Sequence, residues 1–547
     1  MIRSSIEEAI KSALREIGAS EANFVVERPG SFDHGDYASN AALAAAKALK
    51  KSPREVAEDL KKILESQNIS GIEKIDIAGA GFINYFVSPD AIRKEVSAAA
   101  QDDSFGKNRL YAGKKIMVEY TDPNPFKEFH IGHLMSNAIG EAVARALEYS
   151  GAEVKRGNYQ GDVGPHVAKA VWGKMQKPDF SWGEAYVYGS EQYEANKEEI
   201  DAINKKIYEK SDEKINSLYA QGREESLKRF EEIYKALGTT FDFYFFESES
   251  GPKGLVAVQA RKDIFEESDG AVVYRGEKDG LHTRVFVTKL GLPTYEAKDL
   301  GLAEMKKEIW EFDISITITA NEQAEYFKVI LSALFKIHPE WRGQFKHVSH
   351  GMMRFAQGKM SSRKGNIITG ESLLEDLREG AREKMKDRQI VDPETIAQNV
   401  SVGAIKYAVL KQGSGKDIIF DPEKSLSLEG DSGPYLQYAH TRALSLLREA
   451  KKAGIEGSMQ AAPAQPHTLE RLLLHFPNVV ERAAQELEPH YITTYLTELA
   501  GAFNSWYAQE RVIGGKNEKY GVLLVQAIEK TLAKGLHVLG IPAPEEM

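Results

Sequence analysis

The spacing of hydrophobic residues changes near residue 120, and this change predicts a strand followed by a helix. Hydrophobic and polar residues alternate over 115–120, where β-branched residues favour a strand. From residue 133 to about Tyr149, apolar residues recur at helical spacing and predict an amphipathic helix. Pro123 and Pro125 lie between the two segments and impose a loop. A strand, a tight loop and a helix in this order are typical of one nucleotide-binding half of a doubly wound sheet.

The same alternation of strands and helices is interrupted further along the chain and then resumes. From about residue 169 to 238 the sequence is helical in pattern and rich in charge, and two short strands near 271–274 and 283–288 predict a β-hairpin. We therefore expect an insertion at about 168–288 between two halves of one nucleotide-binding fold. The strands expected for that fold are 115–120, 152–158, 314–319 and 345–349.

Different patterns flank this central part. Helices and two strands around the turn Gly79-Ala80-Gly81 predict a small α+β module at the N-terminus, and helical patterns dominate after residue 370. The expected architecture is multidomain α/β, with a Rossmann-like doubly wound catalytic domain and an all-α helical bundle at the C-terminus. The expected boundaries are 1–108, 109–370 and 371–547.

Composition narrows the chemistry. The 547 residues include no cysteine, which excludes disulfides, thiol nucleophiles and zinc bound by cysteine. The net charge of −10 means that any nucleic acid must be bound by local basic patches. No apolar run is long enough to cross a bilayer, and the N-terminal helical pattern lacks a signal-peptide core, so we expect a cytoplasmic protein with no membrane partner.

Two histidines stand at the start of the first predicted helix of the sheet. His130 and His133 are three residues apart and share a helix face, where backbone N–H groups and the positive end of the helix dipole favour phosphate. Gly132 lies between them and lets a flat ring approach the backbone. Two simpler readings are open for the pair: a chance match in a long chain, or histidines that only cap the helix.

Further candidates lie in the second half of the expected sheet. Tyr295 and Asp299 are four residues apart, so a helix would present them on one face to a cationic ligand; an ordinary surface pair is the alternative. The segment 358–366, Gly-Lys-Met-Ser-Ser-Arg-Lys-Gly-Asn, is small, polar and basic. Such a loop can close over phosphates and stabilise charge on pyrophosphate, although a solvated loop has the same composition.

The motifs His130-Ile131-Gly132-His133 and Lys359-Met360-Ser361-Ser362, in this order on a split nucleotide fold, resemble the two signatures of class I aminoacyl-tRNA synthetases. The surrounding sequence is similar to that of the arginyl-tRNA synthetase family, and the resemblance covers essentially the whole chain. The matching stretches are 35–38, 81–84, 118–124, 293–295 with Asp299, 495–507 and 539–547.

The family resemblance implies a reaction and its participants. Arginine and ATP would form arginyl-adenylate and pyrophosphate, and the arginyl group would pass to the 3′ end of tRNA(Arg). Mg²⁺ would accompany ATP, and tRNA would have to bind before arginine is activated. We expect the enzyme to act as a monomer.

The resemblance also implies the roles of individual residues. The residues expected around L-arginine are Glu119, Asn124, Tyr295, Asp299 and Gln323. A guanidinium needs several planar acceptors, which agrees with the two carboxylates in that set. The catalytic residues expected are His130, His133 and Lys359, and ATP is further expected to contact Gly132, Met352, Ser361 and Ser362. Phe82 and Asn84 would bind the outer corner of the tRNA, and the helical bundle would read its anticodon arm.

Two departures from the family pattern stand out. Ser362 replaces the second lysine of the second signature, and Arg363 or Lys364 could supply the missing charge. Glu546 stands near the C-terminus where a basic residue is common.

Three alternative functions are open. A non-catalytic tRNA-binding relative would be expected to have lost the histidines or Lys359. Another class I synthetase would charge another amino acid, and a small nucleotidylyltransferase would lack the helical C-terminal third.

Overall fold

A computed structural model describes residues 2–356, 368–386, 390–460 and 462–547. The chain divides into two compact units, each built from several stretches of sequence. One unit comprises residues 1–107, 438–481 and 494–535, and the other comprises residues 108–437, 482–493 and 536–547.

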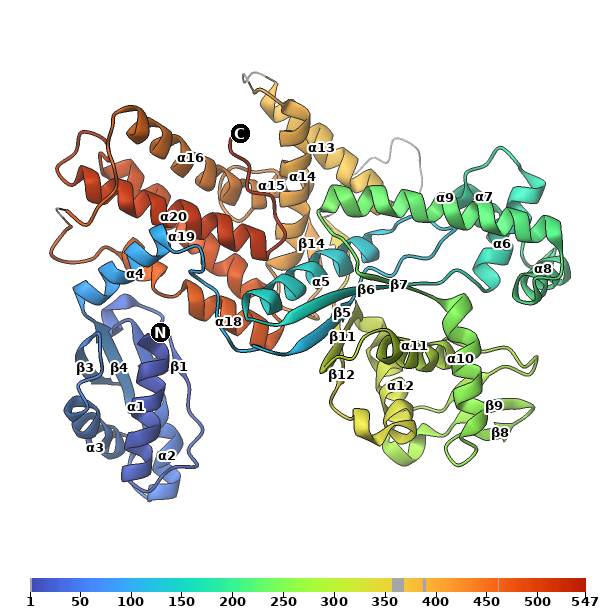
Figure 1. The fold of residues 1–547 in the computed structure, drawn as a ribbon, viewed down its shortest axis with the longest axis horizontal. Coiled ribbons are helices and arrows are strands. Elements are labelled where there is room, and N and C mark those ends of the chain that lie inside the picture. Colours follow the sequence, from blue (N-terminus) through green and yellow to red (C-terminus); the bar gives the residue numbers. More distant parts are fainter. Residues whose placement is uncertain (1, 357–367, 387–389, 461) are drawn as a thin grey trace. The chain divides into compact units, whose positions relative to one another are not determined.

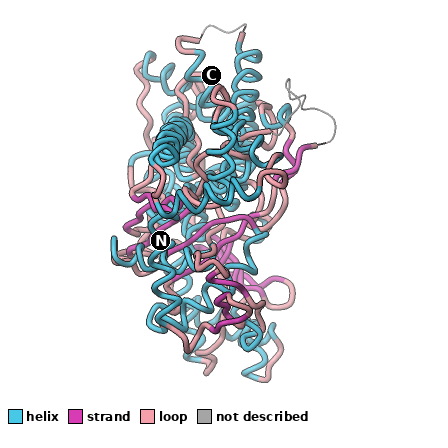
Figure 2. The backbone as a smooth tube through the Cα atoms, turned by 90° about the vertical axis from the view of Figure 1, so that its right-hand side faces the viewer, coloured by secondary structure: helices cyan, strands magenta, loops and turns pink. Residues whose placement is uncertain are grey.

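A five-stranded parallel sheet forms the centre of the second unit (Figure 1). Every neighbouring pair in it is parallel, and the strand order is β12-β11-β5-β6-β7. The chain therefore runs from β5 outward in one direction and later returns to build on the other side of β5, which places a topological switch point between β5 and β11. The strands are β5 (Lys115–Glu119), β6 (Glu153–Gln160), β7 (Phe243–Phe246), β11 (Ile314–Ala320) and β12 (Phe345–His350). They appear as a group of magenta segments in Figure 2.

Helices cover this sheet because their apolar faces match it. The helix α5 (Ile131–Tyr149) is buried along nearly its whole length, as expected for a helix packed on a parallel sheet. The cluster around β7 also contains buried residues of the next helices, including Val258, Leu300 and Val329. Those helices are α10 (Glu247–Ala260), α11 (Tyr295–Ile309) and α12 (Ala324–Ile337). The expected Rossmann-like fold is confirmed.

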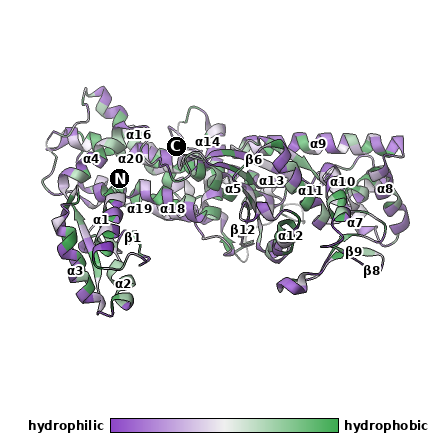
Figure 3. Cartoon of the chain, turned by 60° about the horizontal axis from the view of Figure 1, so that its bottom comes forward, coloured by the Kyte–Doolittle hydropathy of each residue, from purple (hydrophilic) through white to green (hydrophobic). Residues whose placement is uncertain are grey.

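Two separate groups of elements are inserted in the chain between strands of the sheet, one between β6 and β7 and the other between β7 and β11. Strand β7 falls inside the range 168–288, which was expected to be inserted, yet it pairs in parallel with β6 and is an edge strand of the sheet. The first group is α6 (Pro165–Gln176), α7 (Trp182–Glu191), α8 (Lys197–Glu209) and α9 (Glu213–Leu237). The second is β8 (Glu266–Ser268), β9 (Ala271–Tyr274) and β10 (Arg284–Val287), in which β9 and β10 form the expected hairpin. Purple and green residues mix along α9 in Figure 3, as they do in an amphipathic helix.

The N-terminal residues form an antiparallel sheet in the order β1-β2-β4-β3 with helices packed on it. Helix α3 begins at a capping box in which Ser52 accepts from Glu55 N and the Glu55 carboxylate accepts from Ser52 N. The elements are α1 (Ile2–Glu16), β1 (Val26–Glu27), β2 (Tyr37–Ser39), α2 (Ala41–Leu49), α3 (Pro53–Ser66), β3 (Ile72–Ala78), β4 (Phe82–Val87) and α4 (Pro89–Gln101). The α+β character expected from the sequence is confirmed.

The C-terminal part is mostly helical, as expected. The sequence pattern over 467–486 predicts one long helix, whereas the structure has two helices separated by a turn at residues 474 and 475. The helices are α13 (Gly370–Met385), α14 (Pro393–Leu410), α15 (Pro422–Ser425), α16 (Gly433–Lys452), α17 (Thr468–Leu473), α18 (Phe476–Glu486), α19 (His490–Gln509) and α20 (Glu518–Val538), and the short strands β13 (Met353–Phe355) and β14 (Ile418–Phe420) pair in parallel. Among the described residues, no helix has both the length and the apolar composition needed to cross a bilayer.

Candidate active site

A cavity of about 610 Å³ opens at the carboxyl ends of the central strands, at the switch point. Its walls include the ends of β5 and β11 and the first residues of α5 and α11. Eight residues singled out from the sequence line it together: Glu119, Asn124, His130, Gly132, His133, Tyr295, Asp299 and Gln323.

At one end of the cavity the two histidines form a stacked pair. Their ring centroids are 3.4 Å apart, and His130 N donates to His133 Nδ1 over 3.2 Å. This bond leaves Nε2 of a neutral His133 as its N–H donor. Burial lowers the pKa of both imidazoles, that of His133 well below its usual range. The pair therefore offers uncharged N–H donors beside the N-terminus of α5, which suits a phosphate.

The other end of the cavity is acidic. Glu119 is buried and its carboxylate lies 2.6 Å from Nζ of the equally buried Lys306. Asp299 accepts a hydrogen bond of 2.6 Å from Tyr326 OH, and Asp122 accepts one of 2.7 Å from Tyr159 N.

Burial raises the pKa values of two of these carboxyl groups. Burial raises the pKa of Asp299 to about 7, with the charge of Glu119 acting in the same direction against the Tyr326 hydrogen bond. Burial and the charge of Glu119 hold the pKa of Asp122 well above its usual range. Lys306 matches the charge of Glu119, and a cationic ligand would stabilise the carboxylates of Asp122 and Asp299 as well.

A close backbone contact positions Asn124 in the cavity wall. A Cβ atom on Gly161 would lie 2.1 Å from Asn124 Oδ1 and 3.1 Å from Glu247 Oε1. Only glycine can therefore stand at 161 while the Asn124 amide keeps this place. Glu247 also lines the cavity, and its charge is matched by Lys298 Nζ at 2.6 Å.

The remaining sequence candidates lie elsewhere. Met352 is beside the cavity residue His350 but does not line the cavity, and its backbone N–H bonds to Asp417. Lys359, Ser361 and Ser362, together with Arg363 and Lys364, lie outside the described residues. In the N-terminal sheet, Phe82 is 42% exposed whereas Asn84 is 4% exposed.

Sequence reasoning did not select Asp122, Lys306 or Tyr326 for the site. For Lys306 a signal exists, because it lies seven residues after Asp299, and this spacing returns to the same helix face. Asp122 lies in a segment predicted to be a loop, but a loop sequence does not show which side chains point into the site. The sequence carries no comparable signal for Tyr326.

Asp162 lies two residues after β6, and the sequence alone is equally consistent with a site residue and a turn residue there. Its carboxylate is fully buried and accepts from Ser248 N and Oγ, from Tyr219 OH and from Arg223 Nε. These contacts join the first residues of α10 to α9, and Asp162 does not line the cavity. Its role is to hold these elements together.

The substitution Asp162→Asn is expected to lower the free energy of unfolding by about 2 kcal/mol, because buried donors lose a charged acceptor. Thermal unfolding should show a lower midpoint, and the affinity for ligands of the cavity should not change. Asp263→Asn, which affects an exposed pair with Arg261, serves as the control with little expected effect. Weaker ligand binding at unchanged stability would contradict the structural role.

Three family models together match nearly the whole chain. A family model described as tRNA synthetases class I (R), catalytic domain, matches residues 95–422. The model described as DALR anticodon binding domain matches residues 436–547, and that of the arginyl tRNA synthetase N terminal domain matches residues 2–87. The fold and the matching family models are those of a class I aminoacyl-tRNA synthetase.

Individual relatives indicate which family of this class the chain belongs to. The arginine–tRNA ligase of Clostridium acetobutylicum is 30% identical and that of Exiguobacterium sibiricum 32% identical, with 96% and 97%, respectively, of both chains covered. The structure of Thermus thermophilus arginyl-tRNA synthetase matches with a TM-score of 0.82 at 27% identity over the full length of both chains. The chain belongs to the arginyl-tRNA synthetase family.

Proposed function

We propose that the acidic end of the cavity binds L-arginine and that its histidine end binds ATP. The enzyme is an arginine–tRNA ligase, which activates arginine as arginyl-adenylate and then transfers it to the 3′ end of tRNA(Arg). The observation that carries the assignment of the two ends is their contrast within one cavity: buried carboxylates at one end and neutral imidazole donors at a helix N-terminus at the other.

The arginine end favours a guanidinium for geometric reasons. The buried Glu119 and the half-buried Asp299 offer acceptors in the cavity wall, and a planar guanidinium can bond to carboxylates through several N–H groups. Asn124, Tyr295 and Gln323 complete the proposed arginine site. A lysine ammonium would leave some of these acceptors unpaired, and unpaired buried acceptors are costly.

The ATP end acts by position and charge. The helix start, His130, Gly132 and His133 are proposed to hold the phosphates and the adenine ring, with Met352, Ser361 and Ser362 as further contacts. Lys359 is proposed to stabilise the charge on the departing pyrophosphate. ATP is expected to enter as its Mg²⁺ complex, in which the metal would offset part of the phosphate charge.

The tRNA is proposed to contact both flanking parts of the chain. In the N-terminal module, Phe82 presents an exposed ring that suits stacking, and Asn84 lies two residues further along the same strand. The C-terminal helices are proposed to read the anticodon arm. We further propose that the enzyme works as a monomer in the cytoplasm.

ATP–pyrophosphate exchange in the presence of tRNA tests the assignment. Each of the twenty amino acids is offered in turn, and exchange is expected with arginine alone. Exchange with another amino acid, or none with arginine, would contradict the proposal. Transfer of labelled arginine to total tRNA then checks the second step.

Arginine binding is also expected to depend on pH. Burial gives the carboxyl of Asp299 a pKa of about 7, and only its ionised form attracts a guanidinium. Raising the pH from 6 to 8 ionises it and should strengthen arginine binding roughly tenfold, with release of a proton at the lower pH. Isothermal titration calorimetry across this range measures the slope. In Asp299→Asn the slope should vanish, and an unchanged slope would exclude Asp299 as its source.

A further inference from the structure

The turn after β5 has an unusual backbone that must be held in place. Thr121 has a φ of +80° and Asp122 a φ of +47°, and both are residues with side chains. A β-branched residue such as Thr121 rarely adopts this left-handed region, so surrounding contacts have to maintain it. Glu119, Asp122 and Asn124 lie on either side of or within this turn and line the cavity. The conformation of the turn therefore sets the positions of the proposed arginine ligands.

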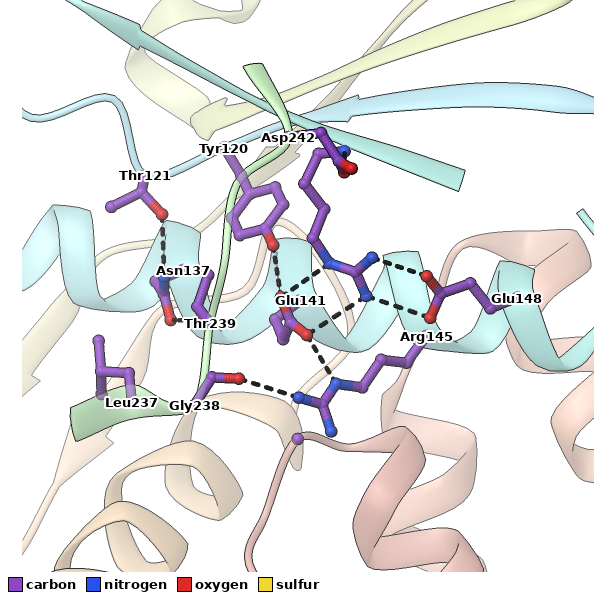
Figure 4. Close-up of polar contacts among 12 residues, drawn as sticks. Tyr120, Thr121, Asn137, Glu141, Arg145, Glu148, Leu237, Gly238, Thr239 and Asp242 are labelled. Carbon is purple, nitrogen blue, oxygen red and sulfur yellow. Dashed lines mark hydrogen bonds and ion pairs between the residues drawn. The ribbon is translucent and has the colours of Figure 1, made fainter. Parts of the chain in front are cut away.

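A row of buried polar side chains on α5 contacts this turn (Figure 4). Asn137 Nδ2 donates to Thr121 Oγ1 over 3.0 Å, and Thr121 N donates to Ser136 Oγ over 2.9 Å. One residue earlier in the turn, Tyr120 OH donates to Glu141 over 2.5 Å. Asn137 is fully buried, and it belongs to neither family signature.

The fit between helix and strand is too close for the turn to move alone. A Cβ atom on Gly140 would lie 2.1 Å from the ring of Tyr120, so this ring rests directly on the helix backbone. Ser136 Oγ also donates to Ile318 O in β11, which ties the same helix face to the neighbouring strand. The turn is thus fixed from two sides by groups of α5.

The outer side of Asn137 connects to the segment that follows α9. Thr239 Oγ1 donates to Asn137 Oδ1 over 3.2 Å, and Arg145 Nη2 donates to Gly238 O over 3.0 Å. Lys406 Nζ donates to Leu237 O over 2.7 Å. Three consecutive residues at the end of α9 are therefore bound to α5 or α14, and Asn137 links this end to the arginine-site turn (Figure 4).

We propose that Asn137 is a positioning residue for arginine activation, which holds the turn at Thr121 and Asp122 in its left-handed form and so places Glu119, Asp122 and Asn124. The inference rests on the proposed arginine site. A buried polar group that contributed only to stability would give the same contacts, so the test must separate arginine binding from folding.

Kinetics of ATP–pyrophosphate exchange with tRNA(Arg) present make that separation. In Asn137→Ala the arginine KM is expected to rise roughly tenfold, because displaced ligands bind poorly, while the ATP KM stays within about twofold. Asn108→Ala is the matched control: Asn108 is a buried amide whose Nδ2 donates to Ser150 Oγ over 3.0 Å, at the far end of the same helix. It should lower the thermal midpoint without changing the arginine KM.

A second substitution asks whether the strained turn is the cause. Glycine adopts positive φ without steric cost, so Thr121→Gly combined with Asn137→Ala should restore most of the arginine affinity. If Asn137→Ala does not fold, Asn137→Ser provides the same measurement, with a smaller rise in the arginine KM expected. Equal changes in both KM values, or equal arginine KM values in Asn137→Ala and Asn108→Ala, would overturn the proposal. Absence of exchange in the unaltered enzyme would instead contradict the proposed function.

Discussion

Replacing Asp299 with Asn is expected to raise the arginine KM about a hundredfold or more while the ATP KM changes little. The carboxylate lies at the acidic end of the cavity, where the Tyr326 hydroxyl donates to it over 2.6 Å and orients it. An amide keeps the shape but removes the charge and turns a donor toward the guanidinium, at a cost of about 3 kcal/mol. Steady-state exchange with each substrate varied in turn measures both constants.

The control for this substitution is Asp263→Asn, which removes a carboxylate from an exposed pair. It should leave both KM values unchanged. If Asp299→Asn raised the two KM values equally, its role would be to support the fold of the site and not to bind arginine. A lower thermal midpoint in Asp299→Asn would point the same way.

Replacing His133 with Ala is expected to slow adenylate formation by at least tenfold, and by roughly a hundredfold if Nε2 donates to the phosphates in the transition state. The hydrogen bond from His130 N to His133 Nδ1 fixes which nitrogen can donate, and the low pKa keeps the ring neutral. The rate should therefore be insensitive to the titration of this histidine above about pH 6. Single-turnover formation of arginyl-adenylate measures the step directly.

The matched control is His282→Ala, an exposed histidine in the connection between β9 and β10. Its rate of adenylate formation should equal that of the unaltered enzyme. An unchanged rate in His133→Ala would refute a role for the imidazole in phosphate binding, and the helix N-terminus alone would then have to supply the phosphate contacts.

The sequence predicted which segments form strands better than it predicted which strands pair with each other. Phe243 and Phe245 alternate and predict a strand, which is observed as β7. The alternation does not show whether this strand joins the central sheet or an inserted one, because pairing depends on residues distant in the chain. For the same reason the sequence predicted one insertion at 168–288, whereas the structure has two: α6–α9 come before β7 and α10, and β8–β10 come after them.

The candidate site divides in a similar way. His130, His133, Tyr295 and Asp299 could be selected because helix periodicity places each pair on one face, and the cavity brings both pairs together. The spacing of Lys306 places it on the helix face of Asp299, but its pairing with Glu119 could not be predicted, because a lysine in a charged helix normally reaches solvent. Burial of a charge is decided by what the fold places over it, which local patterns do not record.

The acidic end of the cavity has a consequence for the survival of the enzyme. Lys306 pairs with Glu119, whereas the hydrogen bonds that Asp122 and Asp299 accept within the described ranges come from neutral donors, so gathering these carboxylates costs folding free energy. Bound arginine relieves this cost, and the free energy of binding adds to that of folding. The supply of the amino acid would then govern resistance to heat and proteolysis as well as turnover, and starvation for arginine would shorten the lifetime of the enzyme that consumes it.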